Sequence, residues 1–177
     1  SLVVFAGAPK EEEDLRQVVT LSKFDTPPVV DGVIEDGEWD RAVRVPRFSV
    51  HGNIEPRDGS SWVGFSEDRL FVAVTSELPP DGTLVTEVEG EDGRTIVDDS
   101  IEFWIDTDLT EGVKQEMHQI IFNAKGVRYD AHWDYGRKEA PRDMNWDGDW
   151  EIANKIGDGV WTAEVSIPFS ELGVDGS

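Results

Sequence analysis

The sequence predicts an all-β protein, an antiparallel β-sandwich of the immunoglobulin-like or jelly-roll type with only short helical turns. Three observations favour this class. Short runs rich in β-branched and aromatic residues recur along the chain, turn residues separate them at regular intervals, and helical periodicity is almost absent. The length of 177 residues suits one domain, and an apolar content of 38% is enough to build a core.

Three hairpins form the predicted framework. Each consists of two β-rich runs joined by a short polar or glycine-containing turn, which is typical of neighbouring antiparallel strands. The paired runs are 61–65 with 70–74, 117–123 with 127–133, and 150–156 with 160–167. Irregular loops are expected over 79–96 and 134–149, and a helical turn over 169–172.

The N-terminal part of the domain is expected to contain a strand and a short helix. Residues 18–23 are β-rich, and Pro27 and Pro28 end that run because proline cannot donate to a sheet ladder. Asp36 is a suitable N-cap for a helix over 37–43 that would bury Trp39.

Alternation over 100–106 predicts a strand that is half buried. Three apolar side chains should face the core and three others should face outward. The inward set is Ile101, Phe103 and Ile105, and the outward set is Glu102, Trp104 and Asp106.

Six of the seven tryptophans, all except Trp104, divide into two expected groups. Trp133 and Trp146 flank a polar loop, so we expect them to be the most exposed. The remaining group is expected to fill the core: Trp39, Trp62, Trp150 and Trp161.

Charge and composition exclude several classes of function. The net charge of −22 repels phosphates, so nucleic acid and anionic membrane surfaces are not expected partners, whereas neutral ligands and cations are. The chain has no cysteine, which excludes disulfides and thiol chemistry. No apolar run is long enough for a membrane span, and no nucleophile elbow, phosphate loop or metalloprotease helix is present, so we expect neither membrane insertion nor an enzyme active site.

Residues 1–14 are expected to form a disordered segment or tail ahead of a domain over 15–177. This region is an apolar stub, a proline and four consecutive acidic residues. Residues 2–8 are similar to the end of a secretory signal, although no basic residues precede them; a tail or an extra strand is the alternative.

Aromatic and acidic side chains together point to a sugar-binding surface. Glu102 and Trp104 should share one face of the sheet, and Trp133 and Trp146 are the other aromatic candidates. An indole ring stacks on the C–H face of a sugar while a carboxylate accepts hydrogen bonds from its hydroxyls. The alternative is that Trp104 only covers the sheet beneath a loop.

Two pairs of carboxylates on turns are candidates for a structural calcium site. Calcium takes six to eight oxygen ligands, and each pair would supply part of such a shell. The alternative is turn chemistry, because Asp and Gly favour turns for their own reasons. The pairs are Asp106 with Asp108 and Asp147 with Asp149.

The order of five segments resembles the family 9 carbohydrate-binding modules and the wider DOMON-like group. The similarity extends over about residues 18–172. The segments are Pro28-Val-Val-Asp-Gly-x-Ile-x-x-x-x-Trp39, Arg69-Leu-Phe-Val-Ala-Val74, Asp99-Ser-Ile-Glu-Phe-Trp-Ile-Asp106, Phe122-Asn-Ala-Lys-Gly126 and Trp161-Thr-Ala-Glu-Val-Ser-Ile-Pro-Phe169. The resemblance implies a β-sandwich without catalytic activity that binds calcium and serves as an accessory module in polysaccharide degradation.

The binding positions implied by this resemblance are only partly filled. Glu102 matches a position that contacts sugar in the family, whereas Ile96 and Ile121 stand near the places of a clamping ring and an arginine. The second ring of the family lies on a segment after Phe169 that Ser177 precedes, so we expect this domain to lack its last strands. Some DOMON relatives bind haem through methionine and histidine; here His118 and His132 should approach each other on the face opposite Met117 and Trp133.

The sequence therefore predicts a secreted module, extracellular or periplasmic, that belongs to a longer chain with further domains. Its expected partner is an oligosaccharide or polysaccharide, with calcium in a structural role. One alternative is a structural or assembly domain that keeps the fold and has lost the sugar site. A less favoured alternative is electron transfer through haem.

Overall fold

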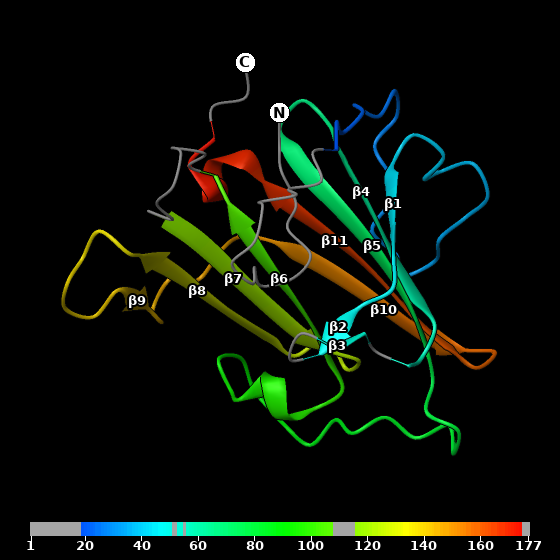
Figure 1. The fold of residues 1–177 in the computed structure, drawn as a ribbon. Coiled ribbons are helices and arrows are strands. Elements are labelled where there is room, and N and C mark those ends of the chain that lie inside the picture. The colour runs from blue at the N-terminus through cyan, green and yellow to red at the C-terminus, as the bar shows by residue number, and fades with distance from the viewer. Residues whose placement is uncertain (1–18, 51–52, 55, 108–115, 175–177) are drawn as a thin grey trace.

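The computed structural model describes residues 19–50, 53–54, 56–107 and 116–174 as a sandwich of antiparallel sheets (Figure 1). The predicted all-β class is confirmed. The described elements are strands and two single 3₁₀ turns, η1 (Thr95–Val97) and η2 (Phe169–Leu172). The predicted tail over 1–14 lies outside the described residues. No helix in the described part of the chain is long and apolar enough to cross a membrane.

One layer is a five-stranded sheet and the other is a four-stranded sheet. The five-stranded order is β1 (Val43–Pro46), β4 (Gly59–Phe65), β5 (Arg69–Glu77), β11 (Val160–Pro168) and β10 (Glu151–Gly157). The four-stranded order is β6 (Ser100–Asp106), β7 (Glu116–Asn123), β8 (Arg128–Asp134) and β9 (Arg142–Asp143). A separate ribbon pairs β2 (Ser49–Val50) with β3 (Asn53–Ile54). All three predicted hairpins are present as β4–β5, β7–β8 and β10–β11.

The main core lies between the two sheets. Trp150 and Trp161 are 1% and 3% exposed there, as predicted, and the ring of Phe122 meets that of Trp161 edge-on at 5.9 Å. Ile101, Phe103 and Ile105 also pack in this core, which confirms the inward half of the alternation in β6. Burying one large aromatic side chain contributes roughly 2–3 kcal/mol, so these rings account for much of the cohesion between the layers.

A third layer, the covering segment over residues 24–42, lies on the outer side of the five-stranded sheet. Phe24 and Trp39 are 4% exposed and pack edge-on at 5.6 Å over Phe71 and Ala73 of β5. The carboxylate of Glu164, fully buried on β11, accepts hydrogen bonds from the Asp31 and Gly32 backbone N–H groups at 3.0 and 2.9 Å. The indole N–H of Trp39 donates a third at 3.0 Å.

These three hydrogen bonds offset part of the free-energy cost of burying the charged Glu164 carboxylate away from water. Burial raises the pKa of Glu164, and the donors from the covering segment favour its charged form and lower it in part. From the sequence, Asp31 and Glu35 are the acidic residues expected to bind backbone N–H groups of this region. Asp31 does accept a hydrogen bond from the Val33 N–H at 2.8 Å, but the long-range anchor is Glu164.

Three sequence predictions in this region are wrong in detail. The predicted helix over 37–43 is instead a turn that is followed by a strand, because Gly37 has a φ of +88° and Val43 already begins β1. The described part of the predicted strand 18–23 makes only one isolated parallel bridge, between Lys23 and Phe65. Trp62 is half-buried on the outer side of the five-stranded sheet, not in the core between the sheets.

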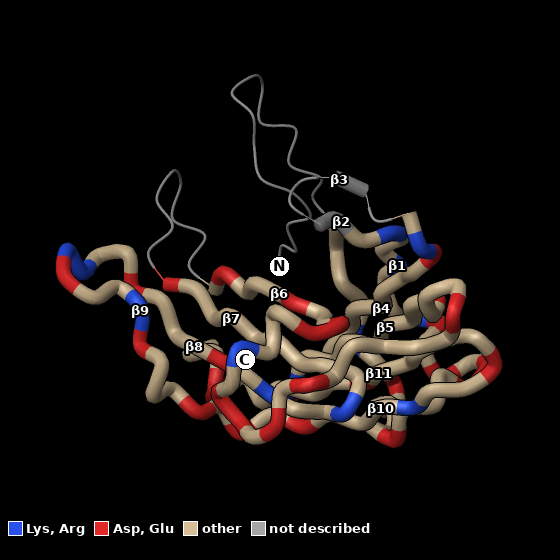
Figure 2. Tube along the Cα trace, turned by 90° about the horizontal axis from the view of Figure 1, so that it is seen from below, with Lys and Arg blue, Asp and Glu red and all other residues tan. Residues whose placement is uncertain are grey.

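Acidic residues are distributed over loops, turns and strand ends of both layers, whereas basic residues are few (Figure 2). The charge therefore forms no single acidic tail within the described residues. A surface of this kind repels anions over the whole molecule.

Candidate functional site

The candidate site is the outer face of the four-stranded sheet, the side turned away from the core. The strand register places outward side chains from neighbouring strands side by side. Trp104 on β6 lies opposite Gln119 on β7, and Glu102 lies two residues away on the same face. Trp133 on β8 lies opposite Arg142 on β9. We call Glu102, Trp104, Gln119, Trp133, Tyr135 and Arg142 the outer platform.

Three aromatic rings form a row across the outer platform. The centroids of Trp104 and Trp133 are 5.5 Å apart with their planes inclined at 50°. Trp133 and Tyr135 are stacked at 5.9 Å with an angle of 17°. Trp104 and Trp133 are half-buried and Tyr135 is 45% exposed, so the row is open to solvent at one end.

Arg142 stands at the β9 side of this row. Its guanidinium lies 5.2 Å from the ring centroids of both Tyr129 and Trp133, and its Nη2 donates a hydrogen bond to the Tyr129 hydroxyl. Two aromatic contacts and one hydrogen bond fix the planar group, which retains further N–H donors for a ligand. The outer platform therefore combines a fixed cationic donor with its aromatic rings.

Gln119 joins the carboxylate and the central ring of the outer platform. Its side chain is 8% exposed; Nε2 donates to Glu102 Oε1 at 2.6 Å, and Oε1 accepts the Trp133 indole N–H at 3.1 Å. Both ends of the amide are thereby used, and only this orientation of the amide satisfies both partners. The exposed Glu102 carboxylate keeps its second oxygen for an external donor.

The structure brings together three of the four aromatic and acidic residues that the sequence nominated for sugar binding. Glu102, Trp104 and Trp133 share the outer platform. Trp146 is half-buried away from it, with its ring 4.9 Å from that of His118, whose side chain belongs to the inner face of β7. Trp133 and Trp146, predicted from the sequence to be the most exposed tryptophans, are both half-buried.

The positions that the family resemblance singled out differ in their surroundings. Ile121 is 3% exposed beneath the outer platform, where it packs with Tyr129 and Ala131. Ile96 is 52% exposed in η1, ahead of β6. Neither side chain supplies the ring or the arginine found at those places in the family.

Sequence reasoning missed Gln119, Tyr135 and Arg142. The signal for Gln119 was available, since alternation along 117–123 places it on the same face as Ile121 and opposite Trp104. Arg142 and Tyr135 were hidden, because both lie at 134–149, a stretch predicted to be a loop, where no periodicity assigns a face.

The histidine pair on the other side of the same sheet is as predicted. His118 and His132 are opposite each other on β7 and β8 with ring centroids 5.0 Å apart. Burial and the neighbouring His132 lower the pKa of His118 to about 4, so this imidazole is neutral at physiological pH. Its Nδ1 has no hydrogen-bond partner among the described residues. Met117 faces the opposite side of β7 and does not join the histidines.

The carboxylates nominated for calcium are distributed over separate places. Asp106 was expected to face solvent but is 9% exposed, and Asp108 lies outside the described residues. Asp147 and Asp149 are exposed, and Asp147 is an electrostatic neighbour of Asp130. Burial raises the pKa of Asp130, whose Oδ2 accepts a hydrogen bond from the Trp150 indole N–H and whose Oδ1 has no partner in the described part of the chain. Within the described ranges, no three histidine or acidic side chains are grouped to hold a metal.

The sequence matches no protein-family model and no curated protein. One similar solved structure is the crystal structure of a "putative carbohydrate-binding protein" from Bacteroides uniformis, with a TM-score of 0.57 and 12% sequence identity. The alignment covers 75% of this chain and 62% of that chain, so this chain spans less than two thirds of the length of that protein. This similarity shows a shared fold.

Proposed function

We propose that this chain is a noncatalytic carbohydrate-binding domain whose ligand lies on the outer platform. The observation that carries the proposal is the hydrogen-bond relay from Glu102 through Gln119 to Trp133. It holds a carboxylate and an indole ring in one fixed arrangement on an open sheet face. The description of the Bacteroides uniformis protein as carbohydrate-binding agrees with this choice of ligand.

The chemistry of the outer platform suits a neutral sugar. The C–H face of a pyranose ring stacks on Trp133 and Trp104, Glu102 accepts a hydrogen bond from a hydroxyl, and Arg142 donates to a ring or hydroxyl oxygen. The 50° angle between the two indoles makes the surface a bent one. It therefore suits a single glycan chain or its end better than the flat face of a crystalline polysaccharide.

Affinity for a short oligosaccharide should be modest. Each aromatic contact contributes about 0.5–1.5 kcal/mol beyond its buried area, and binding must also offset the loss of translational freedom. A dissociation constant on the order of 10 µM to 1 mM follows. Such a module is useful when it is attached to another domain, because attachment raises the effective concentration of the whole protein at the glycan.

Calorimetric titration with cellohexaose, xylohexaose, mannohexaose and laminarihexaose tests the proposal. Trp133→Ala should weaken binding of the accepted sugar by about tenfold or more, which corresponds to ~1.4 kcal/mol. Asp158→Asn, at an exposed turn on the other sheet, is the matched control and should bind normally. Absence of heat with all four sugars, or equal affinity of Trp133→Ala and the control, would refute the outer platform as the site.

The wider setting of the domain is part of the same proposal. We infer a secreted protein of greater length, with one structural calcium ion that steadies the acidic loops. The unpartnered Asp130 Oδ1 beside Asp147 supports an added cation at that end of β8. A melting temperature that a chelator lowers and added calcium restores would support it, and an unchanged melting temperature would remove calcium from the proposal.

An assembly domain is the second candidate, favoured by a different observation. Val85, Ile96 and Val97 are 48%, 52% and 55% exposed around η1. Apolar side chains in this position are typical of a contact surface when they form one patch. Light scattering that shows a concentration-dependent mass, abolished by Ile96→Ser, would favour assembly.

A further inference from the structure

We propose a second carbohydrate-binding site on the opposite sheet, in a hollow of about 370 Å³ between the covering segment and the strands β1 and β4. Its ligand would be a neutral sugar or a similar polyhydroxyl compound. The volume is within the range of small-molecule sites, roughly 300–1,000 Å³. The site goes beyond the proposed function, since none of its residues belongs to the outer platform.

An indole and a guanidinium form one wall of the hollow. Trp62 on β4 lies opposite Arg44 on β1, and the Arg44 guanidinium is 5.6 Å from the Trp62 ring centroid. Nε and Nη2 of Arg44 donate to Ser60 Oγ at 3.2 and 2.8 Å, which fixes the guanidinium. The Trp62 indole N–H and the remaining Arg44 donors reach no acceptor among the described residues, so they are available to a ligand.

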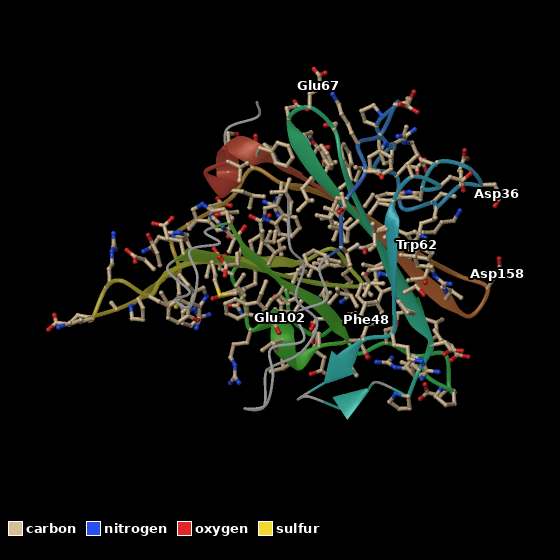
Figure 3. The ribbon with its side chains drawn as sticks, turned by 45° about the horizontal axis from the view of Figure 1, so that its top comes forward. Asp36, Phe48, Trp62, Glu67, Glu102 and Asp158 are labelled. Carbon is tan, nitrogen blue, oxygen red and sulfur yellow. The ribbon has the colours of Figure 1, made fainter. Side chains whose placement is uncertain are left out.

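Three exposed carboxylates on the covering segment form a second wall of the hollow. Glu35, Asp36 and Asp40 line the hollow, and none of them accepts a side-chain hydrogen bond or forms an ion pair with a described residue. They are carried by the turn around Gly37, and Trp39 fixes this turn to Glu164. The wall is therefore preformed, and a ligand need not order the loop in order to bind. Figure 3 shows Trp62 beside β1, Asp36 on the loop of the covering segment to the right of β1, and Glu102 on β6 of the other sheet.

The pairing of these walls selects the ligand. Acidic residues alone would mark nothing in a chain of this charge, but here they line the same hollow as an indole and free N–H donors. Anions are repelled by three carboxylates against one guanidinium. An apolar ligand would leave these groups without partners, at a cost of about 1–3 kcal/mol each. A second cation would meet the guanidinium already placed over the ring. Sugar hydroxyls donate to carboxylates and accept from N–H groups, so they satisfy both walls.

The indole ¹H–¹⁵N signals of the seven tryptophans test the proposal residue by residue. The Trp62 signal is assigned with Trp62→Phe, and the signals of Trp104 and Trp133 are assigned in the same way. The full chain is titrated with the four hexasaccharides named above and, separately, with glucuronate and arginine amide. We expect the Trp62 signal to move in a saturable way with at least one neutral sugar. Asp36→Asn should raise the apparent dissociation constant at Trp62 about tenfold, and Asp158→Asn should leave it unchanged.

The two sites give separable outcomes. Movement of Trp62 that persists in Trp133→Ala confirms a second site, whatever the outer platform does. A Trp62 signal that stays fixed with all neutral sugars while Trp104 and Trp133 move refutes the second site and keeps the proposed function. Movement with arginine amide alone refutes the sugar assignment. Trp62 moving while Trp104 and Trp133 stay fixed refutes the outer platform instead.

Discussion

Replacing His118 by Phe should abolish a loss of stability that the protein suffers in acid. The imidazole is 5% exposed, between the rings of His132 and Trp146 and opposite Ile105 of β6. Burial and, to a lesser degree, His132 lower its pKa from 6.5 to about 4. As the pH falls, His118 therefore becomes protonated near pH 6.5 in the unfolded chain but only near pH 4 in the folded protein.

The sign and size of the effect follow from proton linkage. The stability contribution of neutral His118 is fully present above pH 6.5 and is lost as the pH falls toward about 4. A pKa difference of this size corresponds to about 3 kcal/mol, with a slope of up to about 1.4 kcal/mol for each pH unit. Phe keeps a ring in the same place and removes the unpartnered Nδ1, so stability at pH 7 should change by less than about 1.5 kcal/mol.

Urea denaturation at pH 7.0, 5.5 and 4.5 measures this difference. Wild type should lose stability relative to His118→Phe at each step toward acid. His132→Phe is the informative comparison, because burial is the larger cause of the shift at His118 and most of the acid loss should persist in that variant. Parallel pH profiles for wild type and His118→Phe would show that His118 is not held neutral by the fold, and the reasoning would fail.

Three further predictions concern other residues. Gln119→Leu should lower sugar affinity by about tenfold or more in calorimetric titration, because the Glu102 carboxylate and the Trp133 indole N–H both lose the amide that holds them; unchanged affinity would contradict the relay. Gly32→Ala should destabilise the fold by about 2–4 kcal/mol in urea, because its φ is +83° and a Cβ atom there would lie 2.9 Å from the backbone carbon of Asn154. Asp130→Asn should gain stability relative to wild type as the pH rises, because a raised pKa favours the folded state only in acid; a constant difference from pH 4 to 8 would exclude a raised pKa at Asp130.

The parts of the fold that could be predicted from sequence are those that local physics decides. The hairpin β4–β5 joins two β-rich runs through four polar residues, and the alternation of Ile101, Phe103 and Ile105 assigns the inner face of β6. The position of the histidine pair follows from the β7–β8 register, which the short turn fixes. Each of these features needs only neighbouring residues for its explanation.

The missed features depend on partners far apart in the chain. Glu164 accepts a hydrogen bond from Gly32, which is 132 residues away in the sequence. The alternation of residues along β11 predicts which face of the sheet carries Glu164, but not which segment covers that face. Trp62 was predicted to lie in the core because of its residue type. Its side chain instead lies on the outer side of the five-stranded sheet, where the covering segment buries it only in part. Arg142 joins the outer platform through β9, a two-residue strand that is too short to produce a pattern.

The anchor at Glu164 has a consequence for the order in which the chain folds during synthesis. The covering segment emerges from the ribosome among the first parts of the domain, whereas β11 comes almost last, and β5 pairs with β11 as well. Until β11 is synthesised, the Trp39 indole N–H lacks its acceptor, Glu164. The covering segment is then not held over Phe71 and Ala73. Contacts between residues far apart in the sequence slow folding. A nascent chain that halts before residue 160 would therefore expose the apolar outer face of β5 to chaperones.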